Sequence, residues 1–276
     1  MTAESADPGG TKLIFASANA AEKWRRGKAE RDEFLRRPTE LMLDLAELRA
    51  GLRVLDLAAG TGDQTVMAAR RVGPAGYVLA ADISANMLKL AVEVAQEEGL
   101  TNVETRVMDA EQIDLETDSF DAVICRLGLM LFPDPPKTLK ELHCVLRPGG
   151  KLSAIVFSTA EKNPYQGIPI EILSRLGSVP PPMFALAQPG VLENHLRRAG
   201  FTRVAVHVVG VQRHFPSTAD VLGRIKDASF LRGPMEKLSD TDREQAWMEI
   251  EKRLRGFENP DGFEVRGEYL VGVGTK

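Results

Sequence analysis

Short apolar runs alternate along the chain with longer segments in which apolar residues recur every three or four positions. The short runs are typical of buried strands and lie at 52–57, 77–82, 102–108, 120–125 and 151–157. The longer segments are typical of helices and lie at about 62–72, 85–98 and 135–146. Strands that alternate with helices predict a parallel sheet with helices on both faces.

Capping residues support two of these helices. Ser84 is a good N-cap for the helix over 85–98, and Gly99 is expected to end it. Asp134 precedes two prolines, which a helix tolerates in its first turn. These boundaries are therefore predicted from local chemistry as well as from periodicity.

The first fifty residues predict two further helices. One covers 17–33 and carries Trp24, and the other is apolar and ends at Gly51. Arg37 precedes Pro38, and a residue before proline is pushed out of the helical region, so a break is expected there. Residues 1–12 are expected to be mobile.

The pattern changes after Phe157. A segment rich in proline and apolar residues precedes a helix at 190–199, a long strand at 201–215, two or three helices over 217–258 and a final strand at 263–275. The predicted fold is a doubly wound α/β sheet of seven strands, mostly parallel, with helices on both faces. We expect N-terminal helices over 1–50 and a Rossmann-like domain over 51–276, with helical lid insertions at about 158–189 and 217–258.

Composition narrows the class of protein. The 276 residues suffice for one large α/β domain with insertions, and the net charge of −4 argues against a nucleic-acid surface. A basic cluster between Arg25 and Arg37 is interleaved with acidic residues and is interpreted as a solvated helix face. Two cysteines, Cys125 and Cys144, are too few for a disulfide framework or a zinc site, and both are expected to be buried. No metal is predicted.

No apolar run reaches membrane-spanning length, and the first ten residues lack the apolar region of a signal peptide. The sequence therefore predicts a cytoplasmic protein without a membrane span. It leaves the choice between monomer and homodimer open.

Candidate chemistry centres on the stretch from Val54 to Thr65. An apolar strand ends there in a loop with Gly60 and Gly62, and a helix follows. Glycines let the backbone turn sharply and approach a ligand, and the helix N-terminus presents free N–H groups. Asp56 precedes the loop, where an anion suits a ligand that carries positive charge.

A second acid follows twenty residues after Gly62. Asp82 ends the strand at 77–82, and an acid at that point reaches a ribose diol in doubly wound sheets. A nicotinamide enzyme would show the same acid. Its fingerprint, however, calls for a third Gly or Ala where this chain has Thr65, and it does not call for Asp56.

Five motifs in order resemble those of class I S-adenosylmethionine-dependent methyltransferases, in particular the branch similar to ubiquinone and menaquinone biosynthesis enzymes. Together they are highly specific, and they cover roughly residues 40–157. The matching segments are Asp56–Gly62, Asp82–Leu88, Met108–Glu111, Phe120–Arg126 and Leu146–Gly150. The resemblance implies that the last two strands pair antiparallel and that an N-terminal helix covers the cofactor.

The resemblance also implies S-adenosylmethionine as the cofactor and S-adenosylhomocysteine as the product. Asp56 and the backbone of Gly60 and Gly62 are expected to meet the methionine part, and Asp82 is expected to accept hydrogen bonds from both ribose hydroxyls. Ala58 belongs to the same predicted set. Here Ala58–Ala59 replaces a commoner Gly-Cys pair, which is also small.

The adenine end of the predicted site comes from the next two motifs. Ile83 and Met87 are expected to lie against the adenine face. Asp109 is expected to accept a hydrogen bond from the adenine amino group, and the Ala110 N–H to reach a ring nitrogen. Arg126, at the end of the fourth strand, completes the cofactor-binding set.

No catalytic base follows a recognised spacing. His143, His195, His207 and His214 are scattered over helices and strands outside the motifs. Tyr165 lies just beyond the fifth strand and is the weak candidate. A base is needed only if the acceptor arrives protonated, because positioning supplies much of the rate of methyl transfer.

The acceptor is expected to be a small and largely apolar molecule, such as a quinone-like compound, a polyketide, a terpenoid or another secondary metabolite. Its pocket is expected to form from variable, mostly apolar residues. The candidates are Trp24, Leu127, Met130, Phe132, Tyr165, Met183, Phe184 and Phe230.

Two functions of different class remain open. The first is methyl transfer by in-line displacement. The second is a regulatory or assembly protein that binds S-adenosylmethionine without turnover, because a fold alone does not fix function. A nicotinamide dehydrogenase is disfavoured by Thr65, by Asp56 and by the antiparallel ending.

Overall fold

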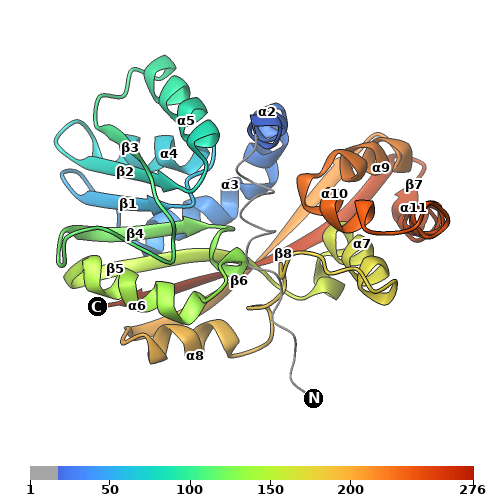
Figure 1. Cartoon of the computed structure of the whole chain (residues 1–276). Helices are drawn as coiled ribbons and strands as arrows, with labels where there is room; N and C mark the ends of the chain where they lie inside the picture. The colour runs from blue at the N-terminus through green and yellow to red at the C-terminus, as the bar shows by residue number, and fades with distance from the viewer. Residues whose placement is uncertain (1–17) are drawn as a thin grey trace.

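The computed structural model describes residues 18–276. The expected mobility of residues 1–12 concerns a segment outside this range. Seven strands form the main sheet in the order β3-β2-β1-β4-β5-β8-β6 (Figure 1). Their bounds are β1 Arg53–Leu57, β2 Tyr77–Asp82, β3 Val103–Val107, β4 Phe120–Arg126, β5 Leu146–Phe157, β6 Thr202–Phe215 and β8 Gly262–Thr275. The two-residue strand β7, Glu258–Asn259, pairs with β8.

The pairing confirms the predicted sheet. β1 pairs in parallel with β2 and β4, and the parallel set continues through β3 on one side and β5 on the other. β8 runs antiparallel to both β5 and β6. The antiparallel last strand is therefore as expected.

Helices cover both faces of the sheet, because each presents an apolar stripe that must be buried. Figure 1 shows α4 (Asp63–Val72) and α5 (Ala85–Glu97) on one side, with α6 (Pro135–Val145) and α8 (Val191–Arg198) on the other. The predicted caps are confirmed, because the side chains of Ser84 and Asp134 accept hydrogen bonds from the backbone N–H groups of Met87 and Lys137.

The break expected at Pro38 is wrong. Helix α3 (Lys28–Leu45) runs through Pro38, and the break falls at Gly27, after α2 (Ala18–Arg26). Leu35 and Met42, on either side of Pro38, are buried in the core. Burying such side chains contributes about 1.5–3 kcal/mol each, which offsets the roughly 3 kcal/mol cost of an interior proline.

The two segments expected as insertions pack together into one helical lobe. The lobe contains α7 (Pro164–Arg175), α9 (Thr218–Asp227), α10 (Ser229–Glu236) and α11 (Asp240–Leu254), with its own hydrophobic cluster. Phe215, Phe263 and Val265 join that cluster from the far ends of β6 and β8. The two longest strands therefore extend from the main sheet into the lobe, and α2 lies between the two parts (Figure 1).

Cys125 is buried as expected, but Cys144 is exposed. The apolar stripe of α6 that faces the sheet runs through Leu139, Leu142 and Val145, which places Cys144 outside it. No group of residues within 18–276 has the composition of a metal site.

Candidate functional site

A largely apolar cavity of about 510 Å³ lies where the parallel strands end. The last residues of four strands line it: Leu57, Asp82, Arg126 and Phe157. Ligands of open α/β sheets bind beyond the carboxyl ends of the strands at the point where the strand order reverses, here between β1 and β4. The cavity also reaches α2, α3 and the helical lobe.

The glycine loop between β1 and α4 forms part of the cavity wall. Ala58, Gly60 and Gly62 all have positive φ, at 58°, 57° and 83°. Ala58 and Gly60 line the cavity, whereas a Cβ on Gly62 would lie 2.9 Å from the Cβ of Ala91 in α5. Gly60 thus lets the backbone face the cavity, and Gly62 lets α4 pack closely against α5.

The Asp82 side chain holds this loop against the end of β2 by a hydrogen bond. Its Oδ2 accepts a hydrogen bond of 2.9 Å from the Gly60 N–H, and its Oδ1 accepts one of 2.9 Å from the Ser84 N–H. The carboxylate lines the cavity, and burial raises its pKa. The acid therefore shapes the loop as well as facing the cavity.

Asp56 is fully buried and is not among the residues that line the cavity. Its carboxylate accepts hydrogen bonds from Gln64 Nε2 at 3.0 Å and from Thr65 Oγ1 at 2.5 Å. Thr65, which occupies the third glycine position of a nicotinamide fingerprint, therefore holds α4 to β1. Direct contact of Asp56 with a cofactor stays a prediction.

Burial raises the pKa of Asp56 to about 7, although the hydrogen bonds from Thr65 and Gln64 favour the charged form. An unfolded aspartate titrates near 3.9. Between these values the native state holds a proton that the unfolded state has lost, so the contribution of Asp56 to stability is full below about pH 4 and disappears as the pH rises through about 7.

Asp56→Asn, which cannot titrate, is expected to remove this pH dependence. Relative to the variant, the wild-type protein should lose about 3 kcal/mol of unfolding free energy between pH 5 and pH 8. Urea denaturation of both proteins at the two pH values measures the difference. A difference between the proteins that does not change with pH would contradict the raised pKa.

Two arginines and one aspartate form a buried charged cluster beside the loop. Asp63 Oδ2 lies 2.9 Å from a terminal nitrogen of Arg31 and 3.1 Å from one of Arg126. Burial alone would raise the pKa of Asp63, yet Arg126 and Arg31 lower it. The cluster carries one net positive charge, and both arginines line the cavity.

Arg31 shows that the solvated-face interpretation is wrong for one member of the basic cluster near the N-terminus. Its side chain is 9% exposed, while Arg25, Arg26, Arg36 and Arg37 are exposed. Charge alternation cannot reveal it, because Arg31 reaches Asp63, which is distant in the sequence.

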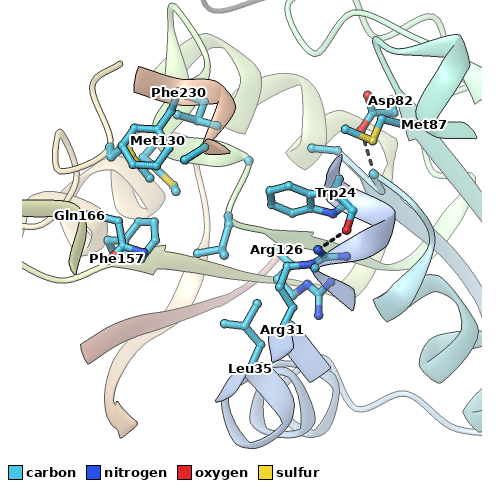
Figure 2. Close-up of a pocket in the computed structure, with 18 of the residues that line it drawn as sticks. Trp24, Arg31, Leu35, Asp82, Met87, Arg126, Met130, Phe157, Gln166 and Phe230 are labelled. Carbon is cyan, nitrogen blue, oxygen red and sulfur yellow. Dashed lines mark hydrogen bonds between the residues drawn. The ribbon is translucent and has the colours of Figure 1, made fainter. Parts of the chain in front are cut away.

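Trp24 of α2 lies over the glycine loop. The guanidinium carbon of Arg31 lies 4.3 Å from the centre of the indole ring, and Arg31 also donates to the Trp24 carbonyl. A Cβ on Gly60 would lie 3.5 Å from the Trp24 ring nitrogen. Figure 2 shows the indole in the middle of the cavity, with Asp82 and Met87 beyond one side and Met130 and Phe230 beyond the other.

The other residues predicted for the adenine end lie together on the Asp82 side. Ile83, Met87, Asp109 and Ala110 all line the cavity. Asp109 also accepts a hydrogen bond of 3.0 Å from the backbone N–H of Glu111, as in a capped turn. The structure thus gathers eight of the ten predicted cofactor residues at the cavity wall, with Asp56 and Gly62 behind it.

The opposite end of the cavity is aromatic. Tyr165 lines it and stacks on Phe215, with ring centres 5.8 Å apart and planes inclined by 15°. Burial raises the pKa of Tyr165. The acceptor-pocket candidates at the cavity wall are Trp24, Leu127, Met130, Phe132, Tyr165, Met183 and Phe230. Phe184 is absent from the wall and packs against Phe157 instead.

Several cavity residues are not predicted from the sequence, namely Arg31, Phe34, Phe157, Gln166, Arg213 and Tyr269. Phe157 carried a usable signal, because it ends the fifth strand. Arg213 and Tyr269 lie within long strands, where nothing marks the side chains that face a cavity. None of the four histidines contributes to the wall.

The sheet order, the glycine loop and the strand-end acid are those of the fold of class I S-adenosylmethionine-dependent methyltransferases. The profile of the ubiE/COQ5 methyltransferase family matches residues 34–180. The chain belongs to this family.

Individual relatives agree with this assignment. The chain is 39% identical over 119 residues to ubiquinone/menaquinone biosynthesis C-methyltransferase UbiE of Methylococcus capsulatus, covering 43% of this chain and 48% of the relative. It is 37% identical over 142 residues to UbiE of Pasteurella multocida, covering 50% and 53%. The matches thus span about half the length of these curated relatives.

Solved structures share the fold. A putative methyltransferase of Bacillus halodurans superposes with a TM-score of 0.61 at 22% identity and covers 86% of this chain and 98% of its own. A SAM-dependent methyltransferase of Aquifex aeolicus gives a TM-score of 0.51 at 25% identity, covering 75% and 93%. Across residues 18–276, no helix is both long and apolar enough to cross a bilayer.

Proposed function

We propose that the protein transfers a methyl group from S-adenosylmethionine to a small, largely apolar acceptor with a quinone-like ring. The observation that carries the proposal is the two-ended cavity. One end holds the glycine loop and strand-end acid expected for the cofactor, and the other end is aromatic and apolar.

The residues present fit the cofactor. The Asp82 carboxylate suits the ribose hydroxyls, and its bond to Gly60 keeps the loop in place. The net positive charge of Arg31, Arg126 and Asp63 suits the methionine carboxylate. When bound, S-adenosylmethionine supplies a methyl group on a positively charged sulfur.

The residues at the adenine end of the cavity also suit the cofactor. Ile83 and Met87 provide an apolar surface, and Asp109 and the Ala110 N–H provide an acceptor and a donor. Trp24 lies between the two ends, so α2 is positioned to close over the ligands and exclude water. These roles extend the family pattern to the matching residues of this chain.

The acceptor assignment rests on the lining of the second end. Met130, Phe132, Phe157, Met183 and Phe230 give it a largely apolar character, and such pockets suit apolar ligands with few polar groups. The relatives' printed name, a ubiquinone/menaquinone biosynthesis C-methyltransferase, favours a quinone-type ring. We propose no nucleic-acid partner.

The chain's contribution to the reaction is mainly positioning. A nucleophilic atom of the acceptor forms a bond to the methyl carbon as the carbon–sulfur bond breaks, and the electron pair of that bond stays on sulfur. An acceptor that arrives protonated also loses a proton. Tyr165 is the candidate to take it, although its raised pKa makes the phenolate scarce at neutral pH.

A methyl-transfer assay with radiolabelled S-adenosylmethionine tests the proposal. Label is expected to pass to reduced naphthoquinone- or benzoquinone-type acceptors and not to peptides or oligonucleotides. If the protein binds the cofactor but labels no member of a broad panel of small molecules, the regulatory alternative replaces the proposed function.

A further inference from the structure

One arginine on β6 is buried at the aromatic end of the cavity. Arg213 is 8% exposed and lines the cavity wall beside Tyr165. Its Nε has no hydrogen-bond partner within the described residues. A buried donor without a partner is costly and therefore needs an explanation.

Aromatic rings from three elements hold this guanidinium in place. Its central carbon lies 4.2 Å from the ring centre of Phe34 in α3, 4.0 Å from that of Tyr165 in α7 and 5.2 Å from that of Phe215 in β6. Cation–π contacts of this kind fix the position of a cation without using its N–H donors. The rings of Phe34 and Tyr165 therefore fix the orientation of the planar group.

The charge around Arg213 is only partly compensated. One terminal nitrogen donates to Glu30 Oε1 at 2.6 Å, and the other carboxylate oxygen of Glu30 accepts from Arg224. Two guanidinium groups therefore share one carboxylate. The adjacent pair at the cavity rim, Lys23 with Asp227, is neutral as a whole. One net positive charge remains among these five groups, beside the aromatic rings that line this end of the cavity.

We infer that Arg213 is a specificity-determining residue that selects acceptors with an acidic oxygen on an apolar ring, such as a phenol, quinol or enol. This inference rests on the proposed function and deepens it. The guanidinium donates a charge-assisted hydrogen bond to that oxygen, and the apolar wall holds the ring. A purely structural role would not explain why Glu30 serves two guanidinium groups and leaves a positive charge without a counter-ion beside the cavity wall.

A matched pair of ring probes tests this inference by binding rather than by turnover. The first probe is lawsone, a hydroxynaphthoquinone that is anionic near pH 8, and the second is its neutral methyl ether. Each is titrated calorimetrically into the protein saturated with S-adenosylhomocysteine. Wild-type protein is expected to bind the hydroxy compound roughly tenfold or more tightly than the ether.

Arg213→Met is expected to remove this preference, weakening the hydroxy compound roughly tenfold while leaving the ether within about twofold. Glu30→Gln is expected to act in the opposite direction, because it removes the carboxylate that competes for Arg213, and to strengthen the hydroxy compound about threefold. If Arg213→Met does not fold, Glu30→Gln still tests the inference. Unchanged or weaker binding of the hydroxy compound in Glu30→Gln would contradict it.

Arg253→Met is the matched control, because Arg253 also forms a pair with a glutamate, Glu171, but lies outside the cavity. It is expected to bind both probes like the wild-type protein. Equal loss of both probes in Arg213→Met, no loss of either, or no binding of the hydroxy compound to wild-type protein would each overturn the inference. Failure to bind S-adenosylhomocysteine would instead overturn the proposed function.

Discussion

Asp82→Ala is expected to weaken the binding of S-adenosylhomocysteine by about 3 kcal/mol, roughly a hundredfold. Two losses combine in this variant. The ribose hydroxyls lose a charged acceptor. The N–H groups of Gly60 and Ser84 lose the carboxylate to which each donates a hydrogen bond of 2.9 Å. The glycine loop is therefore expected to lose its preorganised shape as well as a direct contact. Titration calorimetry on the folded variant measures the effect.

Asp121→Ala provides the matched control. Asp121 lies at the start of β4, away from the cavity, and its carboxylate also accepts a backbone hydrogen bond, of 2.8 Å from the Arg53 N–H. The control should therefore lose some stability and no cofactor affinity. If Asp82→Ala and Asp121→Ala bind S-adenosylhomocysteine equally well, the ribose assignment of Asp82 is wrong.

Gly62→Ala is expected to destabilise the protein by about 3 kcal/mol. The backbone at Gly62 has a φ of 83°, which costs a residue with a Cβ about 1–2 kcal/mol. The new methyl carbon would also lie 2.9 Å from the Cβ and 3.0 Å from the Cα of Ala91, and such overpacking costs about 1–3 kcal/mol. Relief of the overlap would push α5 away from α4 and disturb the loop that faces the cavity.

Gly99→Ala separates these two effects. Gly99 has a φ of 66°, but a Cβ there meets no atom within 4 Å. This control is expected to cost only about 1 kcal/mol, the backbone part of the penalty. Urea denaturation of both variants measures the difference. An equal loss of stability would show that the contact with Ala91 is not tight in solution.

The sheet could be predicted because its signals are local. β1, β2 and β4 are short segments rich in apolar residues, and Ser84 and Asp134 mark helix starts that the structure reproduces. The break at Pro38 failed because the prediction used backbone sterics alone, whereas Leu35 and Met42 bury the same helix on both sides of the proline. Tertiary packing decided that boundary, and packing cannot be read from neighbouring residues.

The two ends of the cavity also differ in how far local sequence signals predict them. The cofactor end follows strand ends and loop glycines, so Asp82, Gly60 and Arg126 could be found from their positions in the sequence. The aromatic end depends on segments that meet only in three dimensions. Arg213 lies between Phe34 and Tyr165, which are far from it along the chain. No local pattern links these three side chains.

The central claim is that the cavity binds S-adenosylmethionine, and titration of the wild-type protein with S-adenosylhomocysteine tests it most directly. We expect saturable binding of one molecule per chain, with no competing binding of a reduced nicotinamide dinucleotide. Absence of binding by S-adenosylhomocysteine in a sample shown to be folded by circular dichroism, or preferential binding of the dinucleotide, would contradict it.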